Sequence, residues 1–270
     1  MKYLIKGTDI TGADYGRVLL NDLNIFLKDF SPYKKIDLGL PSGTLWADRN
    51  IGASNIYDYG KLFQWGDTTP YDVPQHTGNS VNEGQKAFSW NDYKWSASGN
   101  GSKFTKYNTT DRKSTLDLED DAAHVNMGSD WRMPTQQQVT ELFNGTTQEL
   151  YAKLTDGSDP VKVANGEYDE TDHYFWWVYI DGHTRSEVSG KLSYMKLLSK
   201  TNGNFLVVPS SVYVDDGYVE VVGSRGEFWS SSVRSGYISL ARSGCLDDEY
   251  CGVTYDRRCA GLVVRGVVGQ

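Results

Sequence analysis

The sequence predicts an α+β fold with two helices, short antiparallel strands and long irregular loops, plus a helix near the N-terminus. Three observations support this expectation: few segments have apolar residues at helical spacing, many short apolar runs occur, and turn residues are frequent between them. The chain has 270 residues, including 28 glycines and 8 tryptophans, with 39% hydrophobic and 23% charged residues. This length and composition predict a globular chain that buries a substantial core.

The first predicted element is an amphipathic helix over residues 12–30. We expect residues 1–35 to form an N-terminal helical appendage and residues 36–270 to form the main domain. The appendage either packs on this domain or, through residues 12–30, serves docking and oligomerisation, and both alternatives stay open. Apolar residues recur at steps of three and four before Ser31 and Pro32 end the pattern, at Leu19, Leu20, Leu23, Phe26, Leu27 and Phe30.

The main domain contains short predicted strands, two further helices and an insertion. The helix within 115–128 has an acidic first turn, and Leu118, Ala122 and Val125 share a face. In the helix at 134–145, Thr135 and Gln138 form a capping box. A hairpin-like insertion near 150–190 carries aromatic residues between polar turns. The strands are expected within 35–53, 204–214, 218–223, 226–232 and 261–268.

Charge and hydropathy exclude several classes of protein. The net charge of −8 and the pI near 5.0 argue against a nucleic-acid surface, because phosphate binding needs clustered lysine and arginine. The sequence has no apolar run of membrane-spanning length, and its N-terminus has no secretory signal. We therefore expect a chain that is not exported by that route, or one whose leader has been removed.

The sequence contains no motif of a catalytic or metal site. It lacks the nucleophile elbow, the zinc-protease helix, the phosphate-binding loop and the dinucleotide fingerprint, so no catalytic residue is predicted. Asp120 and Asp121 fit the start of a helix better than a metal site. The acidic loops 168–173 and 246–250 lack the alternation of a calcium loop, so structural calcium stays an unsupported alternative and no other cofactor is expected.

The cysteines and tryptophans also bear on the kind of site that the chain could hold. The three cysteines, Cys245, Cys251 and Cys259, do not form a closed set of disulfides and lack the spacing of a zinc site. Several tryptophans, including Trp65, Trp90 and Trp95, lie in loop-like surroundings and suit either a binding surface or a core. We expect most of them to build the core, because the domain has few aliphatic runs.

Several uncommon strings resemble one family in their order along the chain. They are "IDLGLPSGTLWADRNIGA", "DYGKLFQWGDTTP", "DDAAHVNMGSDWRMPT", "TELF", "KTNGNFLVVPSS", "GEFWSSS" and "GLVVRGV". Together they resemble the Fibrobacter-succinogenes-type major paralogous domain of Bacteroidetes proteins, over about residues 36–268. The resemblance implies a C-type-lectin-like fold in which the first and last strands pair and two helices flank a compact sheet. Calcium-dependent sugar recognition is not implied, because the chain lacks the Glu-Pro-Asn and Trp-Asn-Asp motifs and the disulfide framework of animal lectins.

The C-terminal layout also resembles the variable proteins of diversity-generating retroelements. In that family an adenine-directed mutagenic reverse transcriptase rewrites codons near the 3′ end of the gene. In these variable proteins, the rewritten stretch of sequence is bounded at its start by the string "WSSS" and at its end by a Gly-x-x-Val-Arg string. We call this stretch the window. Here Trp229 begins the opening string, and Gly261, Val264 and Arg265 close the window. The resemblance implies a variable region over residues 232–261.

The composition of residues 232–261 agrees with randomised AAC codons. Such codons yield Tyr, Ser, Asp, Gly, Arg and Cys among others, but never Lys, Gln, Glu, Met or Trp. Only Glu249 in this window belongs to the second group. Ordinary family drift is the alternative, because strands also avoid some of these residues and the window has no asparagine. Diversification explains best why arginine replaces lysine completely, since either cation keeps a surface soluble.

The candidate ligand-binding residues follow from this hypothesis. Tyrosine offers rigid amphipathic contact area, arginine offers charge and planar donors, and aspartate offers acceptors. Trp229, Arg258, Gly261 and Arg265 are expected to be the scaffold of the region, with buried structural pairs at Arg258 and Arg265 as an open alternative. The predicted contact residues are Arg234, Tyr237, Ser239, Arg242, Asp247, Asp248, Tyr250, Tyr255, Asp256 and Arg257.

The leading functional hypothesis is a non-enzymatic binding protein with a diversified C-terminal surface. We expect a phage tail adhesin that binds a protein or glycan receptor on a cell, with a homotrimer raising avidity. One alternative is a bacterial surface or pilus-tip adhesin without diversification. The other is an enzyme on a lectin-like fold, either of the formylglycine-generating type, which needs paired reactive cysteines, or a glycan hydrolase, which needs two facing carboxylates.

Overall fold

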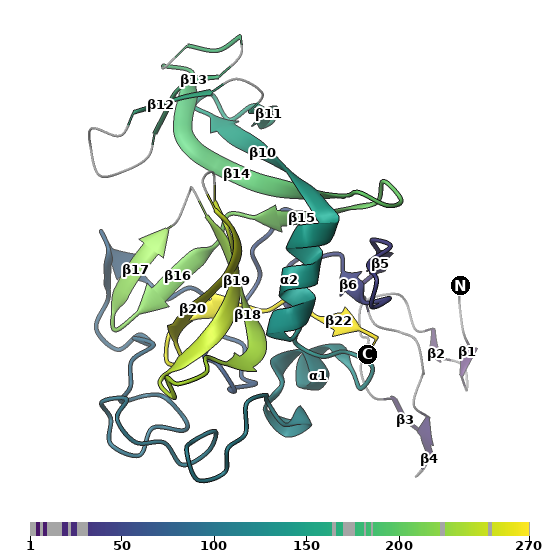
Figure 1. Ribbon diagram of the computed structural model, residues 1–270, viewed down its shortest axis with the longest axis vertical. Helices are drawn as coiled ribbons and strands as arrows, with labels where there is room; N and C mark the ends of the chain where they lie inside the picture. Colours follow the sequence, from purple (N-terminus) through teal and green to yellow (C-terminus); the bar gives the residue numbers. More distant parts are fainter. Residues whose placement is uncertain are drawn as a thin grey trace.

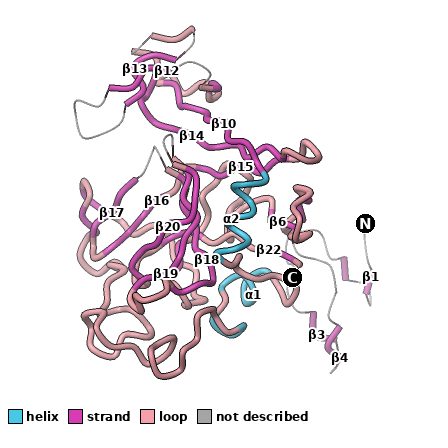
Figure 2. Tube along the Cα trace, viewed as in Figure 1, coloured by secondary structure: helices cyan, strands magenta, loops and turns pink. Residues whose placement is uncertain are grey.

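The computed structural model describes residues 32–163, 182–184, 186–221, 225–247 and 250–269, together with short strands elsewhere. The predicted α+β class, with the C-type-lectin-like arrangement that the resemblance implied, is wrong. Strands dominate the described part of the chain, where four sheets of three to five strands occur beside three two-stranded hairpins. The α-helices of that part are α1 (Ala122–Met127) and α2 (Gln136–Gly145), as Figure 2 shows.

Strands from the two ends of the main domain pair with each other. β6 (Leu45–Ala47) lies between β5 (Lys35–Asp37) and β22 (Val267–Val268), and both pairings are antiparallel. The pairing of first and last strands, which the family resemblance implied, is therefore present. It brings the end of the C-terminal window back onto the start of the domain.

A five-stranded sheet holds the C-terminal window. Its strand order is β20, β19, β18, β21, β7, so β20 lies at one edge. The three window strands pair antiparallel, whereas β18 and β21 run parallel. The bounds are β7 (Leu62–Phe63), β18 (Gly226–Val233), β19 (Leu240–Leu246), β20 (Cys251–Arg257) and β21 (Leu262–Val263).

Two more sheets and a hairpin complete the main domain (Figure 1). In one sheet the long strands β10 (Thr146–Leu154) and β14 (Val188–Ser199) pair, flanked by β11 (Val161–Lys162) and β15 (Phe205–Pro209). Within the range 150–190, where a hairpin-like insertion was expected, β12 (Gly166–Asp169) and β13 (Trp176–Ile180) pair antiparallel. The other sheet contains β8 (His76–Thr77), β9 (Ser80–Val81), β16 (Val212–Asp215) and β17 (Tyr218–Val221).

Helix α2 begins as the sequence predicts. The Thr135 side chain accepts from the Gln138 amide, and the Gln138 side chain accepts from the Thr135 amide, which confirms the capping box. The helix packs on β18, β19 and β20 (Figure 1). A Cβ atom at Gly244 would lie 2.6 Å from the Phe228 ring and 2.9 Å from Val139, so glycine permits this close approach.

The first helical turns differ from their prediction. Leu118 to Asp120 form a short 3-10 turn, and α1 begins only at Ala122. The shared apolar face is wrong, because Leu118 and Val125 are exposed while Ala122 is buried. Asp121 ends the first turn and caps α1, since its carboxylate accepts from the amides of Ala123 and His124.

The helix predicted over residues 12–30 is wrong where the structure describes this segment. β3 (Val18–Leu20) and β4 (Leu23–Ile25) form an antiparallel hairpin, preceded by the hairpin of β1 (Leu4–Ile5) and β2 (Thr8–Asp9). A compact apolar run fits a strand pair as well as one face of a helix. The other residues of 12–30 lie outside the described part of the chain.

Two large clusters of buried side chains form the core. One includes Trp46, Val139, Leu142 and Phe228, and it lies between α2 and the neighbouring sheets. The other includes Trp65, Trp131 and Trp229. The core assignment for Trp65 is confirmed, whereas Trp90 and Trp95 are half-buried. No helix of the described residues is long and apolar enough to cross a membrane.

Candidate functional site

The candidate surface is formed by the exposed part of the window around β19 and β20. Eight large hydrophobic side chains are exposed among the described residues, and three of them belong to this window: Tyr237, Tyr250 and Tyr255. Tyr237 is 55% exposed and Tyr255 is 43% exposed. Three exposed aromatic rings in one window mark a candidate interaction surface, because aromatic rings normally contribute to the core.

Arg234 joins two of these tyrosines. Its guanidinium carbon lies 4.2 Å from the centroid of the Tyr237 ring and 3.4 Å from that of Tyr255. The loop between β18 and β19 fixes this geometry, because the Arg234 amide donates to Leu240 O and the Tyr237 amide donates to Arg234 O. These cation–π contacts hold the guanidinium close to both rings.

Arg242 completes this group. It pairs directly with Tyr255 across the β19–β20 ladder, so the two side chains leave the same face of the sheet. Helix α2 covers that face at Gly244, two residues further along β19. In the neighbouring part of the sheet, next to the part that α2 covers, Arg242 is half-buried and Tyr255 is exposed. We call Arg234, Tyr237, Arg242 and Tyr255 the Arg–Tyr cluster.

Tyr250 lies at the other end of the hairpin. It precedes Tyr255 by five positions, which corresponds to roughly 17 Å between the two Cα atoms along an extended strand. Its hydroxyl donates to Val253 O at 2.9 Å, and its amide donates to the Asp247 carboxylate. The Gln148 side chain donates to Asp247 O at 2.6 Å, which fixes this turn to β10. Asp248 lies outside the described residues.

Asp256 faces away from the Arg–Tyr cluster. It pairs with Ala241 across the ladder and therefore leaves the opposite face from Tyr255. The Ser243 hydroxyl lies 2.9 Å from the Asp256 carboxylate and 2.9 Å from that of Glu227. Burial and the charge of Asp256 raise the pKa of Glu227 well above its usual range. This carboxyl pair was missed from the sequence, because Glu227 and Asp256 meet only through strand pairing.

The two remaining predicted contact residues also have internal partners. Arg257 forms an ion pair with Asp215 at 3.2 Å, and its guanidinium carbon lies 5.5 Å from the centroid of the Trp90 ring. Ser239 is half-buried, and its carbonyl accepts from the Arg258 amide. The structure therefore brings four of the predicted residues together and gives Ser239, Asp256 and Arg257 internal contacts.

The four residues expected to be the scaffold, Trp229, Arg258, Gly261 and Arg265, are all buried. The Trp229 indole is fully buried and donates to Phe63 O at 2.8 Å. Gly261 permits a close approach, because a Cβ atom there would lie 2.6 Å from the Phe88 ring. Its backbone exchanges two hydrogen bonds with Val214. Trp229 and Gly261 thus attach both ends of the window to the body of the domain.

Arg258 is a buried cation beneath the window. Its guanidinium donates to the hydroxyl of Tyr93 and to the carbonyls of Tyr107, Ile238 and Lys106. Four aromatic rings surround it, with centroids 4.5 to 5.8 Å from the guanidinium carbon: Trp65, Tyr93, Phe104 and Tyr107. Because Ile238 follows Tyr237 directly, Arg258 supports the loop that carries the Arg–Tyr cluster.

Arg265 is also fully buried. It donates to the Asn50 side chain at 2.8 Å and to Val207 O at 2.7 Å. Burial lowers its pKa to about 10. Among the described residues neither Arg258 nor Arg265 forms an ion pair, so the alternative of buried structural pairs is wrong there. Both guanidinium groups donate instead to neutral oxygen acceptors, and aromatic rings also surround that of Arg258.

The three cysteines are free thiols, of which Cys251 is exposed and the other two are buried. Burial raises the pKa of Cys259 to about 12 and also raises that of Cys245. The pKa of Cys251 is raised to about 11 by partial burial and the charge of Asp247. All three thiols stay protonated near neutral pH, which is the opposite of an activated nucleophile.

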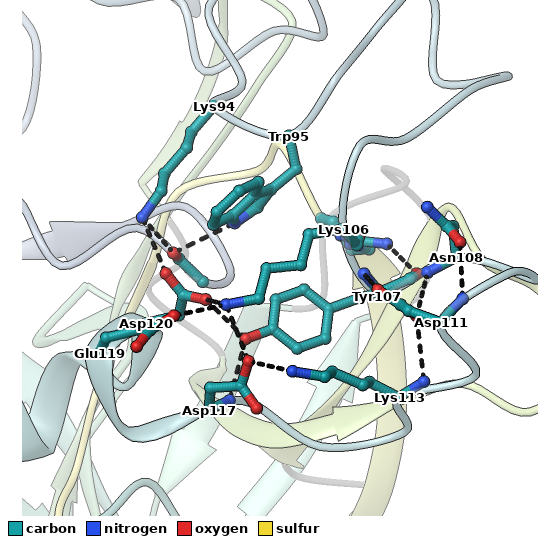
Figure 3. A network of polar contacts seen from close by, with 12 residues as sticks. Lys94, Trp95, Lys106, Tyr107, Asn108, Asp111, Lys113, Asp117, Glu119 and Asp120 are labelled. Atoms are coloured by element: carbon teal, nitrogen blue, oxygen red, sulfur yellow. Dashed lines mark hydrogen bonds and ion pairs between the residues drawn. The ribbon is translucent and has the colours of Figure 1, made fainter.

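Three acidic groups lie close enough together for metal ligation, but lysines neutralise them. Asp117, Glu119 and Asp120 place their oxygens within 4.8 Å of one another. Lys106 Nζ lies 2.8 Å from Asp117, 2.9 Å from Glu119 and 2.6 Å from Asp120 (Figure 3). Lys94 contacts Asp120, and Lys113 contacts Asp117. These contacts and the Tyr107 hydroxyl lower the pKa of Asp120 despite its burial.

This network has a structural explanation. Lys94, Lys106 and Tyr107 come from the long irregular segment before α1, so their contacts with Asp117 and Asp120 fasten that segment to the 3-10 turn. The assignment of Asp120 to a helix start is thus corrected. Asp120 lies in the 3-10 turn before α1 and forms ion pairs with Lys94 and Lys106. Asp121 instead bonds to the Met133 amide in addition to capping α1.

No protein-family model, curated protein sequence or solved structure matches the chain.

Proposed function

We propose that this chain is a non-enzymatic binding protein that attaches to a cell-surface receptor through the Arg–Tyr cluster. The observation that supports this function is the contrast within one window. Tyr237 and Tyr255 are exposed, whereas Trp229 and Arg258 beside them are fully buried. A rigid support under exposed rings lowers the entropic cost of binding.

The support is rigid because each end of the window is bonded to distant residues. Trp229 donates to Phe63, Gly261 bonds to Val214, and Arg258 donates to the carbonyl of Ile238 in the window loop. These contacts do not involve the side chains of the Arg–Tyr cluster. Replacement of those side chains therefore leaves the support in place, which favours a surface that tolerates sequence variation.

The proposal includes diversification of residues 232–261 by a retroelement. The window composition supports it, because the window lacks lysine, glutamine, methionine and tryptophan. We place the protein on a phage tail as a homotrimeric adhesin, where several weak contacts add in avidity. The DNA beside the gene tests diversification: an adjacent reverse transcriptase and a near-copy of these codons, differing only at adenines, are expected. A neighbourhood without them contradicts this part of the proposal.

Two observations favour binding over catalysis. The thiols have raised pKa values, so an enzyme that relies on reactive cysteines lacks its thiolate here. The facing carboxyl groups of Glu227 and Asp256 meet beneath the sheet surface, where Glu227 is only 2% exposed. A glycan substrate needs both carboxyl groups open to solvent.

An attachment assay tests the binding surface. The fluorescently labelled chain is applied to a panel of bacterial cells, and a strain that retains it is selected. In the variant Tyr237→Ala/Tyr255→Ala, we expect at least about tenfold weaker attachment, because two exposed rings of an interface centre are lost.

The control removes equal rings elsewhere. Tyr57→Ala/Tyr218→Ala truncates two tyrosines that are 57% and 47% exposed outside the window, and attachment should be retained. Urea unfolding of both variants checks that the fold is intact. Equal attachment of the wild type and the Tyr237→Ala/Tyr255→Ala variant would rule out this surface.

A further inference from the structure

The Arg–Tyr cluster is cationic although the chain as a whole carries a net charge of −8. Within the described part of the chain, neither Arg234 nor Arg242 forms an ion pair. The Nε atom of Arg242 is buried and has no hydrogen-bond partner. Among the described residues, the cluster thus holds two positive charges that have no ion-pair partner.

Both arginines are neighbours of Tyr255. The Arg234 guanidinium lies 3.4 Å from the centroid of the Tyr255 ring, and Arg242 is the direct cross-strand neighbour of Tyr255. Arg234 lies in the loop after β18 and Arg242 lies in β19, so two like charges approach the same tyrosine and repel each other. An anion that contacts both guanidinium groups offsets this repulsion, so the arrangement favours a negatively charged ligand.

The aspartates of the window that the structure describes, Asp247 and Asp256, have other partners. Asp256 leaves the opposite face and bonds to Ser243. Asp247 lies at the far end of the hairpin, where it accepts from the Tyr250 amide. Asp215, from the neighbouring β16, pairs with Arg257. These acidic groups therefore leave the charge of Arg234 and Arg242 to a binding partner.

Building on the proposed function, we infer that the Arg–Tyr cluster binds an acidic protein surface whose carboxylates dock on Arg234 and Arg242. The planar guanidinium matches a carboxylate through two parallel hydrogen bonds. The rings of Tyr237 and Tyr255 supply the flanking contact area, and tyrosine with arginine is the composition that protein interface centres favour. An acidic polysaccharide shares the charge and is the competing outcome of the test.

The experiment measures fluorescence anisotropy of three labelled probes: an oligoglutamate peptide, an oligoserine peptide of equal length, and heparin. The oligoglutamate peptide should bind the wild-type chain, and the oligoserine peptide should not. In Arg234→Gln/Arg242→Gln, oligoglutamate binding should weaken about tenfold or more. Arg234→Lys/Arg242→Lys keeps the charge without the planar donors and should recover only part of the loss.

The control removes the same net charge at a distance. Lys103→Gln/Lys153→Gln replaces two exposed lysines outside the cluster and should leave oligoglutamate binding unchanged. An equal loss in this control overturns the inference, because binding then depends on total charge alone. Heparin binding that requires the two arginines, without oligoglutamate binding, overturns it in favour of an acidic polysaccharide. Equal urea midpoints of the wild type and variants exclude unfolding as a cause.

The cell attachment assay separates this inference from the proposed function. Loss of attachment in Tyr237→Ala/Tyr255→Ala but not in Arg234→Gln/Arg242→Gln supports the surface and overturns its anionic specificity. Attachment retained in both variants contradicts the proposed function itself. Attachment lost in both, together with oligoglutamate binding, supports the two together.

Discussion

The buried Glu227 and the half-buried Asp256 form a carboxyl pair that the sequence did not predict. Glu227 contacts the Ser243 hydroxyl at 2.9 Å and Arg225 at 2.8 Å, and its pKa is raised by burial and by Asp256. Tyr213, Asp215 and Cys245 add further titratable groups around it. The folded chain therefore holds a proton on this pair that an unfolded chain releases.

The sign of the resulting pH dependence follows from proton linkage. Above the ordinary glutamate pKa of about 4.3, the folded state binds more protons than the unfolded state, so the free energy of unfolding falls as pH rises. Glu227→Gln keeps the shape without the titrating group. We expect its stability relative to the wild type to increase steadily from acidic to neutral pH, as measured by urea unfolding at several pH values.

The matched control for this prediction is Glu83→Gln, at an exposed position. Its difference from the wild type should be small and equal at every pH. A stability difference for Glu227→Gln that stays constant across pH would contradict a proton held by the buried pair.

At the scale of elements, the loop of residues 234–239 is held by a residue that follows β20. Arg258 donates to the carbonyls of Ile238 and Tyr107 and is fully buried, whereas its neighbour Arg257 is half-buried. Two consecutive arginines thus differ in role because strand geometry sends their side chains into different surroundings. This loop positions Tyr237 within the Arg–Tyr cluster.

Replacing each arginine by lysine distinguishes the loop-supporting role of Arg258 from the ion pair of Arg257 with Asp215. Arg258→Lys loses planar donors to several buried acceptors, and we expect about 3 kcal/mol or more of destabilisation in urea unfolding. Amide exchange at Tyr237 and Leu240 should also become faster. Arg257→Lys keeps an ammonium group near Asp215 and should cost less than about 1 kcal/mol. Equal costs for both substitutions would contradict a supporting role specific to Arg258.

At the scale of the whole molecule, the start of the main domain lies slightly before residue 36. The Tyr33 hydroxyl accepts from the Gly52 amide, and its ring packs edge-on against Trp131 at a centroid distance of 6.2 Å. The amide of Lys34 donates to the Asp48 side chain, and the carbonyl of Lys34 accepts from the Asp48 amide. These residues belong with β5 and β6 rather than with the segment before them.

Two truncations test this boundary. A chain that begins at Pro32 keeps the Tyr33 contacts, and we expect it to unfold cooperatively with a midpoint close to that of the full chain. A chain that begins at Ile36 loses a ring contact and several hydrogen bonds, so its unfolding free energy should fall by roughly 2–4 kcal/mol. Equal urea midpoints for the two truncations would argue against a boundary before Tyr33.

The sequence predicted those elements whose determinants are local. Helix α2 was predicted because Thr135, Gln138 and the apolar stripe lie within one short segment. The scaffold role expected for Trp229 and Gly261 came from the resemblance and not from a local pattern, and both residues are buried. Local patterns failed at residues 18–25, where leucine spacing favours a helix and the chain forms a hairpin.

Long-range pairing explains the remaining errors. The segment at 146–154 has no strand-like alternation, yet β10 pairs with β14 over most of its length. Such strands form because a partner is available, which outweighs intrinsic preference. In the same way, the meeting of Glu227 with Asp256 and the separation of Tyr250 from Tyr255 depend on register and turn position.

The edge position of β20 has a consequence for evolution. One side of this strand pairs with β19, while the other side has no partner strand in the described sheet. Substitutions there disturb one ladder instead of two, so more variants of this strand should fold than variants of a strand paired on both sides. The same open edge carries a hazard, because apolar descendants offer a template for strand pairing between copies. Charged residues along β20, such as Asp256 and Arg257, should therefore be retained among variants that stay free of aggregation.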